Sequence, residues 1–183
     1  MSQSNTENRK KRIAVDMDEV IADALGEHIT RYNRQYQMEM TREDLHGKNI
    51  REAVPFEISH EVESLVHTTE FFSELEVFPH AKEVLERLSK DYDIFIATAA
   101  MEVPLSFQSK YEWLLRHFPF ISPMNFVFCG DKSIVDADYL IDDNARHFAR
   151  FKGKGILFDA PHNKNVEGYP RAKSWLDIEA LLN

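Results

Sequence analysis

Features that would place this chain in a specialised class are scarce in its sequence. Cys129 is the only cysteine among 183 residues, which excludes a disulfide within the chain and suits a reducing cytoplasm. No apolar run approaches the ~20 residues that a membrane-spanning helix needs. The eight histidines show neither the H-x-x-x-H nor the H-E-x-x-H spacing that is typical of zinc sites.

Charge and composition exclude further classes. The chain has 31 acidic and 22 basic residues and a net charge of −9, which argues against a nucleic-acid polymer or an anionic membrane as partner. With 183 residues, 43% of them hydrophobic, it has room for one domain with a sizeable core. Residues 1–12 are polar and basic and precede no apolar segment long enough for a signal peptide. We expect a disordered N-terminal tail there, with a basic recognition arm as the alternative.

An acidic pair follows the first apolar run. Ile13-Ala14-Val15 has the length and the β-branched ends of an inner strand in a parallel sheet, and Asp16-Met17-Asp18 comes directly after it. Two carboxylates at this spacing repel each other unless a cation holds them, and oxygen ligands suit Mg²⁺. The D-x-D pattern predicts a site for Mg²⁺ and phosphate, with a solvated turn as the alternative for this motif alone.

Three later apolar runs also end in polar residues. They are 92–97 followed by Thr98, 126–129 followed by Gly130-Asp131-Lys132, and 139–141 followed by Asp142-Asp143-Asn144. In an open parallel α/β sheet, ligands bind outside the carboxyl ends of the strands. Taken singly, these residues could be a helix N-cap, a solvated lysine and a turn. Their shared position at strand ends favours one site.

The order of these residues along the chain separates two families. Receiver domains of response regulators also collect acidic residues, a threonine and a lysine around Mg²⁺, but there the acidic pair comes first and the lysine last. Here the order is D-x-D, Thr98, Lys132 and then the D-D pair. This order resembles the haloacid dehalogenase-like hydrolase superfamily.

A closer resemblance within that superfamily is to the 5'(3')-deoxyribonucleotidases of the pyrimidine, cytosolic type C family. The stretches that carry it span nearly the whole chain after the tail: Asp16-Met17-Asp18-Glu19-Val20-Ile21-Ala22-Asp23, Phe71-Phe72-Ser73-Glu74-Leu75-Glu76, Lys110-Tyr111-Glu112-Trp113, Asp131-Lys132-Ser133-Ile134-Val135, Leu140-Ile141-Asp142-Asp143, His162-Asn163 and Lys173-Ser174-Trp175. The resemblance implies a cytoplasmic enzyme with Mg²⁺ as cofactor and a small phosphate monoester as substrate. It leaves the oligomeric state open, with a homodimer as one alternative.

A long insertion separates the first two predicted strands. Residues 21–77 carry apolar side chains at helical spacing, and the segment is several times longer than the dozen residues that a parallel crossover needs. We expect a small helical cap over the strand ends, at the position of the superfamily's type-one cap; the alternative is a helical pair that only completes the core. The predicted fold class is α/β, a three-layer α/β/α Rossmann-like sandwich with a parallel central sheet formed by residues 13–20 and 78–183.

The expected chemistry follows from charge. A phosphate monoester dianion repels an attacking carboxylate, so Mg²⁺ and Lys132 must first neutralise its charge. Thr98 and Ala99, which follow the apolar run 92–97, are the expected phosphate-binding residues. Asp16 is the expected nucleophile, which forms an aspartyl-phosphate. Asp18 is the expected general acid and base. A dehalogenase needs neither this acid nor the metal, so phosphomonoester hydrolysis is the predicted reaction.

Four acidic residues are candidates for the metal shell. We expect Mg²⁺ to bind the carboxylate of Asp16, the main-chain carbonyl of Asp18 and the carboxylate of Asp142. Asp143 is expected to orient the metal shell or Lys132 rather than to bind the ion directly.

The sequence departs from the resembling family where the base should bind. Where the vertebrate enzymes carry a Phe, an aromatic pair and an Arg, this chain has Ala24, Lys48-Asn49 and Gly130. Lost ring faces remove stacking worth roughly 1–3 kcal/mol per base, by analogy with single strands. A deoxynucleotide is the expected substrate; a sugar phosphate or similar phosphometabolite, and non-catalytic binding of such a compound, are the alternatives.

Overall fold

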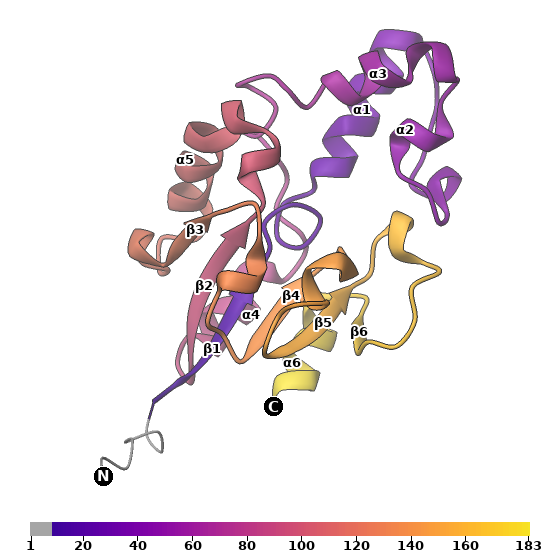
Figure 1. The fold of residues 1–183 in the computed structure, drawn as a ribbon. Coiled ribbons are helices and arrows are strands. Elements are labelled where there is room, and N and C mark those ends of the chain that lie inside the picture. Colours follow the sequence, from indigo (N-terminus) through magenta and orange to yellow (C-terminus); the bar gives the residue numbers. More distant parts are fainter. Residues whose placement is uncertain (1–8) are drawn as a thin grey trace.

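A six-stranded parallel sheet organises the chain in a computed structural model, which describes residues 9–183 (Figure 1). The strand order is β3-β2-β1-β4-β5-β6. The strands are β1 (Lys11–Val15), β2 (Tyr92–Thr98), β3 (Phe126–Phe128), β4 (Tyr139–Asp142), β5 (Lys154–Phe158) and β6 (Arg171–Ala172). Strand β1 begins at Lys11, two residues earlier than expected, and most of the predicted tail lies outside the described residues. Strand β6 was not predicted because two residues carry no periodicity.

The centre of the sheet is strand β1. It pairs with β2 on one side and with β4 on the other, so that Ile13 lies beside both Ile94 and Tyr139. The chain winds outward from β1 through β2 to β3, and then from β4 through β5 to β6 on the other side. The strand order therefore reverses between β1 and β4, which is where open α/β sheets bind their ligands.

The two faces of the sheet are covered differently. One face packs against α4 (Ala81–Leu88), α5 (Phe107–His117) and α6 (Trp175–Leu182) in the largest hydrophobic cluster. The opposite face, with Ala14 and Leu140, packs against the short 3₁₀ segment η6 (Ala145–Phe148) and against loop residues such as Ala137 and Phe151. The connections 129–138 and 143–153 are about a dozen residues or fewer, which is too short for a full helical crossover. The predicted α/β class with a parallel sheet is confirmed, with a thin second layer.

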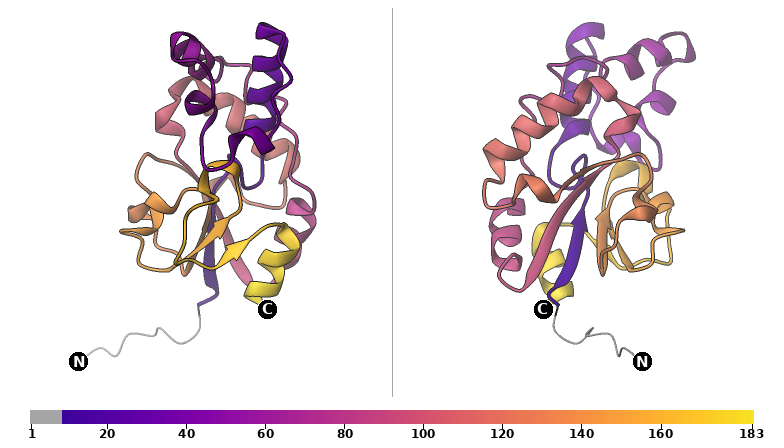
Figure 2. Two further views of the ribbon diagram at one scale, coloured as in Figure 1. Left: turned by 90° about the vertical axis from the view of Figure 1, so that its right-hand side faces the viewer. Right: turned by 60° about the vertical axis from the view of Figure 1, so that its left-hand side comes forward.

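The predicted helical insertion after β1 is also confirmed. It contains α1 (Ala24–Tyr36), η1 (Glu43–Leu45), α2 (Ile50–Ala53) and α3 (Phe56–Ser64). These elements stand over the carboxyl ends of the strands (Figures 1 and 2). They enclose a small hydrophobic cluster of their own: Ile29, Tyr32, Leu45, Ile50, Val54 and Val62. None of the helices in residues 9–183 combines the length and the apolar character needed to cross a membrane.

Two buried tryptophans hold the segments that join the insertion to the sheet. The indole N–H of Trp175 donates to the carbonyl of Val20 at 2.8 Å, and that of Trp113 donates to the carbonyl of Leu75 at 2.9 Å. Both indoles are fully buried. The outgoing and returning segments also pair with each other, since the N–H of Phe78 donates to the Ile21 carbonyl. Hydrogen bonds thus fix both segments that connect the insertion to the sheet.

These indoles predict a measurable stability effect. Replacing Trp175 or Trp113 by Phe leaves a buried carbonyl without its donor, which should lower the free energy of unfolding by about 1–3 kcal/mol. Denaturant unfolding would measure the change, with Leu176→Ala, on the exposed side of α6, as the milder control. Unchanged stability in both tryptophan variants would contradict this role.

Candidate active site

Four strand ends deliver their polar side chains to one point, as predicted. The ammonium group of Lys132 lies 2.8 Å from Asp16 Oδ1 and 2.6 Å from Asp142 Oδ2. Lys132, Asp142 and Thr98 are fully buried, and Asp16 is nearly so. The N–H of Asp16 donates to the Ile141 carbonyl at 2.9 Å, which extends the β1–β4 pairing into the site. Asp16 and Asp142 are therefore held side by side by both backbone and lysine.

A cluster of three carboxylates surrounds this point. One oxygen from each of Asp16, Asp142 and Asp143 lies within 4.8 Å of the others. Both oxygens of Asp142 already have partners, because Oδ2 accepts from Lys132 and Oδ1 accepts from the N–H of Asn144 at 2.8 Å. Within residues 9–183, the carboxylate of Asp143 forms no ion pair with a lysine or arginine. Asp143 thus belongs to the cluster together with Asp16 and Asp142.

The cluster contains three carboxyl groups but only one ammonium group. Burial raises the pKa of Asp16 to about 6, with Lys132 opposing the rise and the neighbouring Asp142 and Asp18 adding to it. Burial, followed by Asp142 and Asp16, raises the pKa of Asp143 well above its usual range. Burial alone would lower the pKa of Lys132, but its two carboxylate partners raise it further, so the lysine stays charged. One ammonium group cannot neutralise three carboxylates, and a divalent cation with a preference for oxygen ligands fits this donor set.

Lys110 is a site residue to which sequence reasoning assigned no role. It lies on α5 with 2% of its surface exposed, and its ammonium group is 2.5 Å from Asp18 Oδ2 and 3.1 Å from Thr98 Oγ1. The signal was present in the sequence: Lys110 shares a helix face with the buried Trp113 and Leu114. A lysine at a core position of an amphipathic helix requires a buried acidic partner.

Glu19, directly after the D-x-D motif, links the site to the insertion. Its backbone has a φ of 56°, and its buried carboxylate accepts the N–H of Leu25 at 2.7 Å. The Arg42 guanidinium, which precedes η1, donates to Glu19 at 2.8 Å and also binds Asp23. This ion pair ties the insertion to the loop that presents Asp16 and Asp18.

A cavity of about 260 Å³ opens between the insertion and the site residue Asp18. Its walls are mainly apolar and aromatic: Ala24, Leu25, Ile50, Val66, Phe71, Phe72 and Val103, with Glu19, His28, Lys48, Asn49 and His162 as the other polar members besides Asp18. Three of the four positions that depart from the family pattern thus line this cavity. Gly130 lies instead in a separate hollow with Arg146 and His147.

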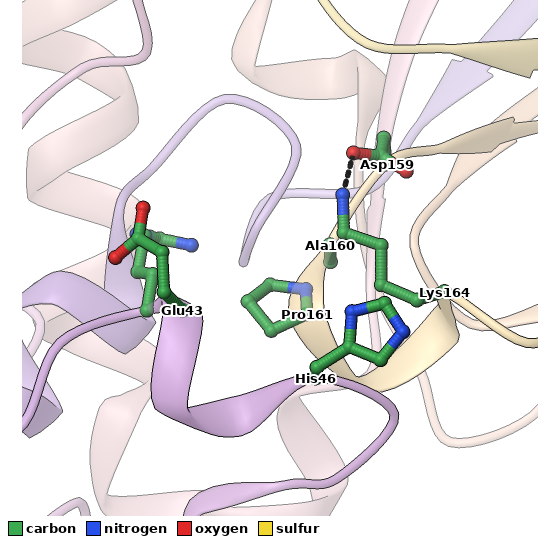
Figure 3. A pocket seen from close by; sticks show the side chains of 7 residues that line it. Glu43, His46, Asp159, Ala160, Pro161 and Lys164 are labelled. Atoms are coloured by element: carbon green, nitrogen blue, oxygen red, sulfur yellow. Dashed lines mark hydrogen bonds and ion pairs between the residues drawn. The ribbon is translucent and has the colours of Figure 1, made fainter.

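Another hollow, of about 350 Å³, lies at the seam between η1 and the loop after β5 (Figure 3). Charged side chains such as Glu43, Asp159 and Lys164 line it, and Lys164 pairs with Asp159. None of the predicted catalytic residues reaches it. The cavity at Asp18 is therefore the candidate substrate site.

Comparison with known proteins agrees with this geometry. Residues 10–183 match the family model described as 5' nucleotidase, deoxy (pyrimidine), cytosolic type C protein. A Bacillus subtilis 5'(3')-deoxyribonucleotidase is 35% identical over 175 residues, which cover 94% of this chain and 99% of the relative. A Staphylococcus epidermidis protein, whose name assigns the same activity provisionally, is 47% identical over 176 residues, covering 95% and 97%.

Solved structures show the same fold at low identity. A haloacid dehalogenase-like hydrolase from Streptococcus pneumoniae superposes with a TM-score of 0.64 at 12% identity, covering 95% of this chain and 99% of that one. A haloacid dehalogenase-type hydrolase from Bacillus subtilis, solved with magnesium bound, gives a TM-score of 0.58 at 12% identity, covering 96% and 100%.

The raised pKa of Asp16 predicts how stability depends on pH in metal-free protein. Between pH 4 and 6 the unfolded chain loses the Asp16 proton while the folded protein keeps it, so this residue destabilises the fold increasingly as pH rises. We therefore expect wild type to lose stability relative to Asp16→Asn as pH rises from 4 to 7, by on the order of 1–3 kcal/mol. Denaturant unfolding in a chelator would measure it. Asp93→Asn, at an exposed position, is the control, and a stability difference that does not change with pH would refute the assignment.

Proposed function

Since this chain belongs to the NT5C family of 5'(3')-deoxyribonucleotidases, we propose that the cluster at its sheet edge hydrolyses deoxynucleoside monophosphates through an aspartyl-phosphate on Asp16. Membership makes the protein a nucleotide phosphomonoesterase within the haloacid dehalogenase-like superfamily. The observation that carries the proposed mechanism is the contact of Lys132 with both Asp16 and Asp142 inside the acidic cluster. The family description and the single cysteine support a cytoplasmic location.

Asp16 is arranged to act as the nucleophile. Its Oδ1 accepts the N–H of Met17 at 2.8 Å and lies at the same distance from Lys132, which leaves Oδ2 for the phosphorus atom. In the first step a bond forms from Oδ2 to phosphorus while the bond to the leaving-group oxygen breaks. Water then attacks the phosphorus, which releases inorganic phosphate and restores the Asp16 carboxylate.

Asp18 is arranged to move the proton in both steps. Lys110 holds its Oδ2, whereas its Oδ1 is shielded from solvent and has no hydrogen-bond partner within the described part of the chain. We assign Oδ1 to proton transfer: it gives a proton to the leaving oxygen and then takes one from the attacking water. General acid–base help of this kind contributes about 10²–10⁴-fold.

Thr98, Ala99 and Lys132 form the proposed phosphate site. Thr98 Oγ1 accepts from Lys110, so its own proton is available for a phosphate oxygen. The main-chain N–H of Ala99 follows at the end of β2 as a second candidate donor. Lys132 adds the positive charge that the dianion requires.

The carboxylates that we propose to hold Mg²⁺ are those of the acidic cluster, with the main-chain carbonyl of Asp18. When bound, the ion supplies Lewis-acid stabilisation of phosphate charge. The expectation that Asp142 binds it directly stays a prediction. Asp143 lies close enough to join Asp16 and Asp142 as a ligand, since one oxygen of each lies within 4.8 Å of the others. The magnesium-bound Bacillus subtilis structure supports an ion in this fold.

The substrate cavity supports a nucleoside group beside the phosphate site. Ala24, Lys48 and Asn49 remove aromatic surface from its walls, but Phe71 and Phe72 remain there, packed edge to face with centroids 4.8 Å apart. These rings and His28 supply an alternative surface for a base. A smaller sugar phosphate is the second candidate, favoured by the loss of aromatic residues at the three departing positions.

Turnover is predicted to require Asp16 and to prefer nucleotides. A panel of deoxynucleoside monophosphates and sugar phosphates, assayed with Mg²⁺, should give the highest kcat/KM with a deoxynucleotide. Asp16→Asn should lose at least about 10³-fold in kcat because no nucleophile remains. An Asp16→Asn protein that hydrolyses an aryl phosphate at nearly the wild-type rate would contradict the covalent mechanism. A preference for sugar phosphates would contradict the substrate assignment.

Asp18 is predicted to affect substrates according to their leaving group. Asp18→Asn keeps the main-chain carbonyl but cannot donate a proton, so a deoxynucleotide with a poorly leaving alkoxide should barely react. An aryl phosphate needs little protonation and should still phosphorylate Asp16. Single-turnover phosphorylation of the two substrates should therefore show a much larger loss for the nucleotide. Equal losses would mean that Asp18 is not the acid.

A further inference from the structure

The loop after β5 also reaches the acidic cluster, although it carries none of the strand-end residues predicted to form the site. It contains the 3₁₀ turn η7 (Pro161–Asn163). The Nε2 atom of His162 lies 3.1 Å from the main-chain carbonyl of Asp143 and 3.5 Å from its Oδ2. Because a carbonyl only accepts, the ring nitrogen that faces it must carry the hydrogen. The same N–H therefore lies against both the backbone and the carboxylate of Asp143.

Asn163 fixes this loop in place. Its Nδ2 donates to the carbonyls of Asp143 and Phe158 at 2.7 and 2.8 Å, and its Oδ1 accepts from the N–H of Ala160 and from Arg171. With 1% of its surface exposed, the amide uses all of its hydrogen-bonding capacity. A fully satisfied buried amide is rigid, so His162 is held at a defined position next to Asp143.

The insertion holds the same loop from its other side. The N–H of Gly47 donates to the Pro161 carbonyl at 2.8 Å, and Gly47 has a positive φ of 73°. This contact stands beside the hollow at the seam between η1 and the loop, where Pro161 and the Lys164–Asp159 pair lie opposite His46 and Glu43 (Figure 3). The loop is thus anchored by protein contacts alone, before any ligand binds.

We propose that His162 is a positioning residue, which sets the orientation of the Asp143 carboxylate for a divalent cation. The inference rests on the proposed metal site. His162 also lines the proposed substrate cavity, whereas Asp143 does not. Partners that orient a ligating group typically change metal affinity by 10–100-fold when they are removed. His162 should therefore affect Mg²⁺ binding itself, in the absence of substrate.

Calorimetric titration of Mg²⁺ into metal-free protein, without substrate, tests this role. His162→Phe keeps the ring but removes the N–H, and it should raise the Kd for Mg²⁺ by about 10-fold. His162→Gln keeps a donor and should recover most of the affinity. Asp143→Asn removes the carboxylate itself, so its rise in Kd for Mg²⁺ is the largest that a change at His162 should cause. The matched control is His46→Phe, at an exposed histidine across the seam, which should leave the Kd unchanged.

The outcomes separate the inference from the function on which it rests. Unchanged Mg²⁺ affinity in His162→Phe, or equal weakening in the Phe and Gln variants, would overturn the positioning role while leaving the proposed function intact. If wild type and Asp143→Asn bind Mg²⁺ equally, Asp143 takes no part in the metal site and the inference fails, whereas the proposed metal site fails only if wild type itself binds no Mg²⁺. Circular dichroism would check folding, and if His162→Phe fails to fold, His162→Leu provides the same comparison.

Discussion

The contact of one buried ammonium group with two carboxylates underlies the whole site. Lys132 is fully buried between Asp16 and Asp142, which end the adjacent central strands β1 and β4. Removing a charge from water is costly unless it is paired at short range, and neither the lysine nor the carboxylates could be buried alone. The residues that would attack a phosphate and neutralise its charge therefore also pair with one another, and these ion pairs allow all three to be buried at the edge of the sheet.

This arrangement leaves a deficit of positive charge that substrate binding increases. Of the clustered Asp16, Asp142 and Asp143, only the first two contact a lysine, and a phosphate monoester would bring two further negative charges. A divalent cation held by these carboxylates would offset both sets of negative charge. Asp18, to which we assign proton transfer, pairs instead with Lys110. The proposed nucleophile and the proposed acid thus each contact a different lysine.

The insertion can vary without disturbing that chemistry. Its helices enclose their own hydrophobic cluster, and two tryptophans fix the segments that connect it to the sheet. Changes such as Ala24, Lys48 and Asn49 therefore alter the substrate cavity while the strand-end residues keep their contacts. The family model matches residues 10–183, insertion included, and we propose that substrate preference depends on the cavity walls.

Local patterns in the sequence were enough to predict the α/β class, the parallel sheet, the helical insertion and the convergence of Asp16, Thr98, Lys132 and the second acidic pair. Each of these depends on an apolar run and on the residue that ends it, because parallel strands bring their carboxyl ends to one edge. Only the tertiary structure decided which lysine pairs with Asp18, how near Asp143 lies to the cluster, and that His162 reaches it. The contacts of Lys110 with Asp18 and of His162 with Asp143 join residues 92 and 19 positions apart, and their geometry depends on how helix and loop pack against the sheet.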